Sequence, residues 1–181
     1  MKVLIDANVL YPTVLREVVL GVARAGLFVP LWSARILEEW ARAAAKLGPE
    51  GEAIARGEVA ALALHWPKAQ VVPRDGDMAR LWLPDPDDVH VLAAAVAGSA
   101  DLILTMNARD FPRNLLAEEG LDRADPDSFL TGLYARDPDA VAGVVAAVLD
   151  EARRLSGEQL ERRWLLKRAR LTRLSKALDR G

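Results

Sequence analysis

Two short apolar runs, each followed by acidic residues, constrain the fold of this chain most strongly. Residues 3–5 (VLI) and 102–104 (LIL) are continuous stretches of apolar, strand-compatible residues. Continuous runs, unlike alternating ones, are typical of strands buried on both faces, as in a parallel sheet. Asp6 directly follows the first run, and Asp110 lies shortly beyond the second. Because ligands bind beyond the carboxyl ends of parallel strands, both carboxylates are expected to face a crevice.

Predicted strands and helices alternate through most of the chain, which indicates an α/β fold with a mostly parallel sheet covered by helices. Strands are expected at residues 2–5, 27–31, 69–72, 101–104 and 121–124. Helices are expected at residues 13–25, 34–47, 50–65, 86–97, 113–118, 126–134, 138–155 and 157–178. No strand is predicted after residue 124. The expected organisation is therefore a catalytic domain at 1–135 and a basic, helical C-terminal extension at 136–181.

Further acids lie in segments that the predicted sheet can bring together. Asp85, Asp87 and Asp88 open an Ala/Val-rich helix. Asp85 precedes a proline and is explained as a helix N-cap with proline at the first helical position. Glu38 and Glu39 are adjacent on an earlier predicted helix and point about 100° apart, so at most one of them is expected to face the pocket.

The order of these acids resembles the PIN-domain endoribonucleases, including the VapC-type toxins. The shared pattern is a strand ending at Asp6, Glu39 on an early helix, Asp88 opening the VHVLAAAVA helix, and T-x-N-x-x-D-F containing Asp110. The resemblance covers residues 1–135, and the tail is similar to a subgroup with a helical C-terminal extension. It implies a PIN-like three-layer sandwich.

The resemblance also selects among neighbouring acids. It favours Asp88 over the two aspartates before it, and Glu39, six residues beyond Ser33, over Glu38. Asn107 stands where many relatives have Asp, which makes Asp110 the expected fourth acid. The four catalytic acids implied are Asp6, Glu39, Asp88 and Asp110, of which Asp6, Asp88 and Asp110 would bind metal. Three polar residues are expected to support them or to orient water: Asn8, Thr105 and Asn107.

Crowded carboxylates repel one another and stay ionised only when cations neutralise them. Ligand sets made of oxygen atoms suit Mg²⁺ or Mn²⁺. Together with the resemblance, this chemistry implies metal-dependent hydrolysis of RNA phosphodiester bonds. The family further implies a homodimer and, for a toxin, a neighbouring antitoxin protein. The RNA target, and a toxin role as against RNA processing, stay open.

The amino-acid composition argues against several other classes of protein. The chain of 181 residues has no Cys, and its two His are isolated, so neither a disulfide scaffold nor a zinc site is expected. No apolar run approaches the ~18 to 20 residues of a membrane-spanning helix. The sequence starts with a predicted strand and leaves no room for a signal peptide, so a cytoplasmic enzyme is expected.

Charge is unevenly distributed along the chain. Residues 153–181 contain ten Lys and Arg against three acids, a net charge of +7, whereas the whole chain carries −2 and the remainder therefore −9. A basic tail can bind a polyanion, or its arginines can pair with the acidic body. Arg163, Lys167 and Arg170 are spaced to form one stripe on the helix predicted at 157–178, and RNA contact is the functional interpretation.

Three other interpretations compete with a nuclease. A haloacid-dehalogenase-type phosphatase needs a second Asp two residues after the first, and position 8 is Asn8. A phospho-receiver domain needs a late Lys, and there is none between Lys68 and Lys167. A catalytically impaired PIN-like module that binds RNA or a protein partner stays open, because Asn107 replaces an acid.

Overall fold

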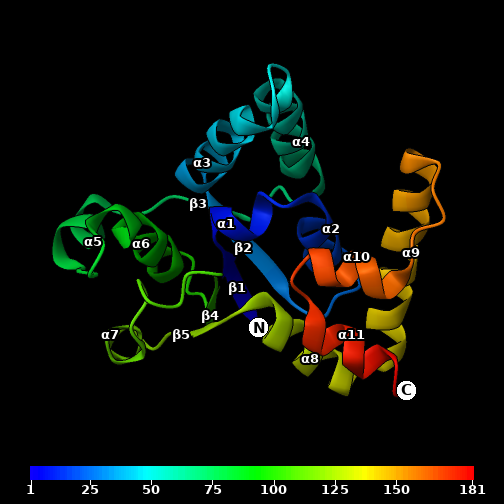
Figure 1. Ribbon diagram of the computed structural model, residues 1–181. Coiled ribbons are helices and arrows are strands. Elements are labelled where there is room, and N and C mark those ends of the chain that lie inside the picture. The colour runs from blue at the N-terminus through cyan, green and yellow to red at the C-terminus, as the bar shows by residue number, and fades with distance from the viewer. The chain divides into compact units, whose positions relative to one another are not determined.

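The computed structural model describes residues 1–181, and its strands form a single five-stranded sheet (Figure 1). All neighbouring strands are parallel, in the order β3-β2-β1-β4-β5. The strands are β1 (Lys2–Ile5), β2 (Val29–Ser33), β3 (Gln70–Val71), β4 (Leu102–Leu104) and β5 (Asp122–Ala124). The predicted α/β fold with a mostly parallel sheet, flanking helices and a helical C-terminal extension is confirmed.

Helices occupy most of the remaining chain. Those before β4 are α1 (Ala7–Leu10), α2 (Thr13–Arg24), α3 (Ala34–Ala44), η1 (Ala45–Leu47), α4 (Gly51–His65), α5 (Asp75–Arg80), η2 (Pro86–Asp88) and α6 (Val89–Ala97). Those after β4 are α7 (Arg113–Glu118), α8 (Pro126–Arg136), α9 (Pro138–Ser156), α10 (Arg162–Arg168) and α11 (Thr172–Leu178). The short helices α1 and α5 were not expected from the sequence.

The prediction of one helix at residues 157–178 is wrong. The chain forms two short helices there, because α10 ends at Arg168 and Arg170 adopts a left-handed backbone conformation with φ of 60°. Arg170 therefore does not continue the helical face of Arg163 and Lys167, and the stripe predicted for these three residues is broken at its last member.

Strand β1 is the buried centre of the sheet and sets the position of the site. Its last three residues, Val3 to Ile5, have no exposed surface, as expected for a strand covered on both faces. Ile5 pairs in register with Leu104 of β4. Both strands end at this pair. The residues that follow them, Asp6 and Thr105, therefore lie next to each other at the carboxyl edge of the sheet. Helix α6 packs against three strands of the sheet, β1, β2 and β4.

The chain divides into two compact units. The first contains residues 1–11 and 29–124, with the whole sheet, and the second contains 12–28 and 125–181, with helices α2 and α8 to α11. The division predicted at residue 135 stays a prediction, since a compact unit need not be a domain. Every acid of the predicted site lies in the first unit.

Within the second unit, a buried carboxylate joins two helices. Asp127 of α8 is 9% exposed and accepts hydrogen bonds from the backbone amides of Arg173 (2.8 Å) and Leu174 (3.0 Å) and from the Thr172 hydroxyl (3.3 Å). These groups form the first turn of α11, whose amides have no partner within the helix. Asp127 therefore caps α11 from a distant part of the sequence. The aromatic rings of Phe28 and Phe129 pack edge to face in the same unit, with centroids 5.2 Å apart.

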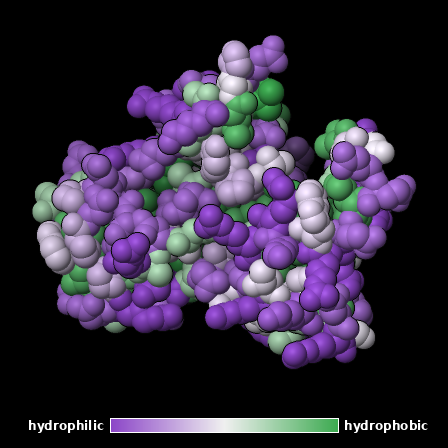
Figure 2. Space-filling view, in the orientation of Figure 1, coloured by the Kyte–Doolittle hydropathy of each residue, from purple (hydrophilic) through white to green (hydrophobic).

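Hydrophilic side chains cover most of the visible face of the molecule, and hydrophobic ones gather at the tip of α9 (Figure 2). No helix is both long and apolar enough to cross a membrane.

Candidate metal centre

Asp6 is the buried member of the candidate site, with 5% of its surface exposed. It occupies the residue between β1 and α1, with an extended backbone, and its side chain makes no capping hydrogen bond to that helix. Its Oδ2 atom instead accepts hydrogen bonds from the Thr105 hydroxyl at 2.7 Å and the Asn8 amide at 2.6 Å. Capping of α1 therefore does not explain this aspartate.

The polar residues predicted to support the acids form a continuous hydrogen-bonded chain. The Asn8 side chain donates to Thr105 at 3.2 Å and accepts from the amide of Met106 at 3.0 Å. The Thr105 hydroxyl accepts from the amide of Asn107 at 3.0 Å, and the Asn107 side-chain amide donates to Asp110. These contacts fix the loop after β4 against the end of β1, and so connect Asp6 to Asp110.

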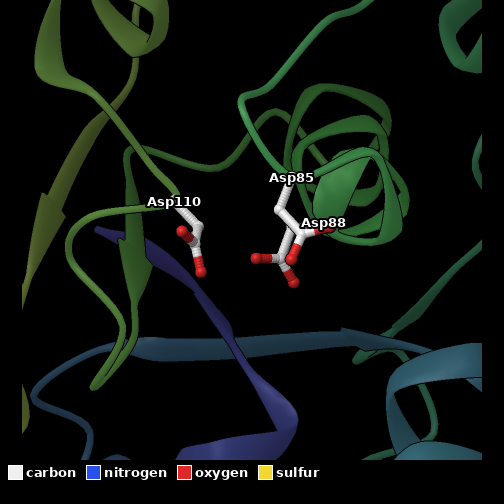
Figure 3. A group of neighbouring side chains, drawn as sticks. All are labelled: Asp85, Asp88 and Asp110. Atoms are coloured by element: carbon white, nitrogen blue, oxygen red, sulfur yellow. The ribbon is translucent and has the colours of Figure 1, made fainter.

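Two further carboxylates converge on Asp110 at the end of this hydrogen-bonded chain. Ligand oxygens of Asp85, Asp88 and Asp110 all lie within 4.8 Å of one another. Figure 3 shows the carboxylates facing one another across the gap between the loop after β4, which supplies Asp110, and the start of η2 and α6, which supplies the other two. Two segments more than twenty residues apart therefore contribute one acidic cluster.

The electrostatics of Asp88 show that this cluster is crowded. Burial, followed by the negative charges of Asp6, Asp85 and Asp110, raises the pKa of Asp88 to about 6. Burial also raises the pKa of Asp6, the hydrogen bond from Thr105 opposes the increase, and the charge of Glu39 adds to it. Repulsion among these groups is the condition that a bound cation relieves.

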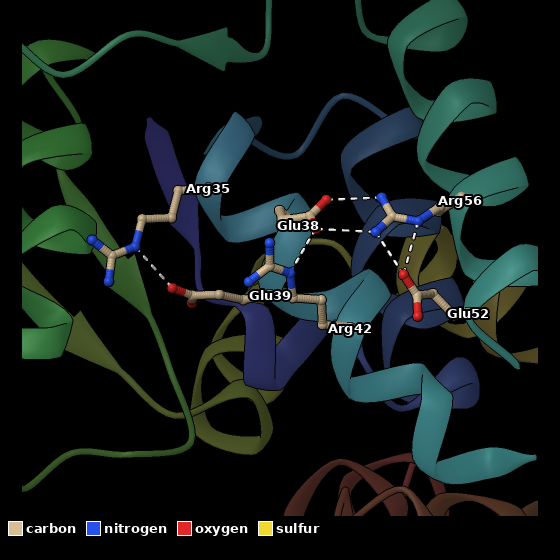
Figure 4. Close-up of polar contacts among 6 residues, drawn as sticks. All are labelled: Arg35, Glu38, Glu39, Arg42, Glu52 and Arg56. Atoms are coloured by element: carbon tan, nitrogen blue, oxygen red, sulfur yellow. Dashed lines mark hydrogen bonds and ion pairs between the residues drawn. The ribbon is translucent and has the colours of Figure 1, made fainter.

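The two adjacent glutamates of α3 point to different surroundings (Figure 4). Glu38 accepts hydrogen bonds from Arg42 at 2.7 Å and from Arg56 of α4 at 2.8 Å, and bonds from Arg56 and then Arg42 lower its pKa to about 2. Glu38 therefore belongs to an exposed ion-pair network between α3 and α4.

Glu39 lies on the side of α3 that meets α6, where it contacts His90. Its Oε1 atom is 2.9 Å from Nε2 of His90 and 3.1 Å from Nε of Arg35. Partial burial raises the pKa of Glu39, but His90 and Arg35 outweigh that effect and hold it below the usual range. The structure does not bring Glu39 into the cluster of three aspartates.

His90 is a contact of the site that the sequence did not reveal. The side chain is 3% exposed on the first turn of α6, and Nδ1 has no hydrogen-bond partner. Its position two residues after Asp88 was visible, but its partner comes from α3, far away in the sequence.

Asp85 was explained from the sequence as a helix cap, and in the structure it is also a member of the acidic cluster. Its side chain accepts a hydrogen bond from the amide of Asp87 at 2.9 Å, which confirms the cap. A carboxylate of Asp85 also belongs to the acidic cluster. Asp85 can therefore cap the start of η2 and contribute an oxygen to the acidic cluster at the same time.

The sequence model of the family described as PIN domain matches residues 2–109. The matched segment contains Asp6, Glu39, Asp88 and Asn107 and ends one residue before Asp110. No curated protein and no solved structure matches the chain.

Proposed function

The chain belongs to the PIN-domain family, and on that premise we propose that it is a divalent-metal-dependent endoribonuclease that hydrolyses RNA phosphodiester bonds. The observation that carries the proposal is the convergence of Asp85, Asp88 and Asp110 beside the buried Asp6. PIN domains are generally nucleases, and a cluster of carboxylates at the carboxyl edge of a parallel sheet suits that activity.

The donor set fits Mg²⁺ or Mn²⁺. The available ligands are carboxylate oxygens with asparagine and threonine beside them, which hard divalent cations prefer. The only histidine nearby, His90, directs Nε2 to Glu39. Asp6, Asp88 and Asp110 would hold the metal, with Asp85 as an additional ligand.

A divalent ion bound there would supply an activated water and would stabilise charge on the leaving oxygen of a phosphodiester. The residues of the chain prepare the site for it. Thr105 and Asn8 hold the Asp6 carboxylate by hydrogen bonds, and Asn107 holds Asp110. Glu39, kept ionised by His90 and Arg35, would bind metal or accept a proton from the attacking water.

The test is cleavage of a labelled single-stranded RNA by purified protein, with Mg²⁺, with Mn²⁺ and with a chelator. We expect cleavage only with a divalent ion, and products that carry a 5′-phosphate. Asp6→Asn and Asp88→Asn should each abolish this activity while the protein stays folded. Activity at the wild-type level in either variant, at the same metal concentration, would show that the acids have been assigned wrongly.

A second candidate is a PIN-like module that binds RNA or a partner without cleaving, and one observation favours it. The position where many relatives carry an acid is Asn107, whose amide donates to Asp110 and adds no negative charge to the cluster. If the protein is such a module, RNA should bind, but no cleavage products should form at any metal concentration. The cleavage assay therefore separates the two candidates.

We propose in addition that the protein acts in the cytoplasm as a homodimer, and that it is the toxin of a toxin–antitoxin pair whose antitoxin covers the acidic cluster. Chromatography with light scattering measures the dimer. Growth arrest on expression of the wild type, without arrest by Asp88→Asn, tests the toxin role.

A further inference from the structure

The outer side of α10 presents an exposed indole among basic side chains. Trp164 is 48% exposed, and Arg168 follows it by one helical turn, as Lys167 follows Arg163. The inner side of the helix consists of the buried residues Leu165, Leu166 and Ala169. The exposed residue Arg170 follows the helix. We call the five exposed residues the α10 surface: Arg163, Trp164, Lys167, Arg168 and Arg170.

None of the four cations of the α10 surface forms an ion pair or a side-chain hydrogen bond, unlike the basic residues that hold the tail together. Arg162 on the same helix pairs with Asp179 at 2.8 Å, and Arg173 donates to the Ser128 hydroxyl at 2.6 Å. Lys167 and Arg168 lie in the last turn, where the helix dipole favours positive charge, but Arg163 lies in the first turn, where it does not. Stability of the helix therefore does not account for Arg163.

The arrangement of Trp164 and Arg168 suits nucleotide bases. The Arg168 guanidinium lies over the indole at 5.0 Å from the ring centroid. Indole rings and guanidinium planes both stack on unpaired bases, and cations beside them bind the phosphates that follow. Bases inside a duplex are already stacked on each other and are not available to such a side chain.

We propose that the α10 surface binds single-stranded RNA, with Trp164 stacked on an unpaired base and Arg163, Lys167 and Arg168 on phosphates. The choice of RNA as the nucleic acid rests on the proposed function, whereas the choice of a single strand rests on the exposed indole. The α10 surface differs from the stripe predicted from the sequence, since it adds Trp164 and Arg168 and its member Arg170 lies beyond the end of the helix.

The experiment measures affinity for a single-stranded oligoribonucleotide of about 12 nucleotides over a range of salt concentrations, with a chelator present so that nothing is cleaved. Trp164→Ala should weaken binding about 5- to 150-fold, the equivalent of one lost base stack, and should leave the salt dependence unchanged. Trp164→Phe, which keeps an aromatic face, should retain most of the affinity.

Removing charge should have the opposite signature. The variant R163A/K167A/R168A should reduce the magnitude of the negative slope of log affinity against log salt by about 0.7 for each phosphate contact, or about 2 in all. The control R136A/K176A/R180A removes the same number of exposed, unpaired cations from the second unit and should change the slope by less. Circular dichroism checks that each variant is folded.

Three results would overturn the proposal. Wild-type affinity in Trp164→Ala excludes the stack, and an equal change of slope in the control variant excludes a specific surface. A change of oligomeric mass in Trp164→Ala with unchanged RNA affinity makes the surface a protein interface. A different result would count against the proposed nuclease function alone. In that case Trp164→Ala weakens RNA binding as expected, but the wild type does not cleave RNA when Mg²⁺ or Mn²⁺ is added.

Discussion

The Thr105 hydroxyl donates a 2.7 Å hydrogen bond to Oδ2 of Asp6, across the carboxyl ends of two paired strands. Both side chains are almost fully buried, so the bond holds the carboxylate in one orientation without competition from water. We predict that Thr105→Val, which removes the donor, lowers metal affinity about 10- to 100-fold, as the loss of a group that supports a metal ligand does. Thr105→Ser keeps the hydroxyl and should keep most activity. Metal titration of both variants by calorimetry measures the difference, and equal affinities would contradict it.

The adjacent glutamates of α3 provide a matched pair of variants. Glu39→Gln should reduce metal-dependent cleavage about 100-fold or more, because Glu39, kept ionised by His90 and Arg35, is proposed to bind metal or to accept a proton from the attacking water. Glu38→Gln changes an exposed ion-pair network and should leave cleavage unchanged. Initial rates on one RNA at one metal concentration measure both. Greater loss from Glu38→Gln than from Glu39→Gln would reverse the assignment.

The raised pKa of Asp88 predicts how the metal-free protein responds to pH. The pKa is about 6 in the folded chain and 3.8 when the group is unperturbed. The folded protein therefore holds a proton between these values that the unfolded chain has lost, so the contribution of Asp88 to stability decreases as pH rises from about 4 to about 6. Asp88→Asn removes this contribution. The variant should be more thermostable than the wild type above pH 6 in chelator, and the difference should shrink towards pH 4.

Added Mg²⁺ or Mn²⁺ provides the control for that measurement. A bound cation neutralises the cluster and stabilises the folded state by mass action, so it should raise the melting temperature of the wild type more than that of Asp88→Asn. An equal rise in both proteins would mean that the ion binds elsewhere.

Gly21 of α2 lies against Val144 of α9, and a Cβ atom added at Gly21 would lie 2.5 Å from the Cγ1 atom of Val144. Alanine gains about 1 kcal/mol of helix propensity over glycine, but overpacking against a stiff β-branched side chain costs about 1 to 3 kcal/mol. We predict that Gly21→Ala destabilises the wild type. The same change in a Val144→Ala background should stabilise, because the clash is gone. Chemical denaturation of the four proteins measures this reversal of sign, and additive effects would contradict it.

The sequence predicted the parts of the fold that local patterns determine. Strand β1 and helix α7 have the predicted bounds, because an apolar run or a proline before a short helix marks each of them. The break between α10 and α11 was missed, since no glycine or proline marks it. What starts α11 there is the carboxylate of Asp127, which caps its first turn from 46 residues away.

The candidate site, too, could be predicted only in part, because several of its contacts join residues that are far apart in the sequence. Asp6 and Asp110 could be placed because each follows a predicted strand, and the family resemblance selected Asp88 among the acids that open a helix, but Asp85 was assigned to capping alone. The choice between Glu38 and Glu39 needed a family resemblance, since Arg56, which engages Glu38 together with Arg42, belongs to the next helix. His90 was set aside because its contact with Glu39 depends on how α3 and α6 approach each other.

The central claim is that Asp6 and the acidic cluster together bind the metal ion on which RNA cleavage depends. The most direct measurement is the anomalous diffraction of a crystal grown or soaked with Mn²⁺. We predict a peak within about 2.0 to 2.6 Å of carboxylate oxygens of Asp6 and Asp88. A manganese ion bound elsewhere, with these carboxylates in contact only with water, would contradict the claim.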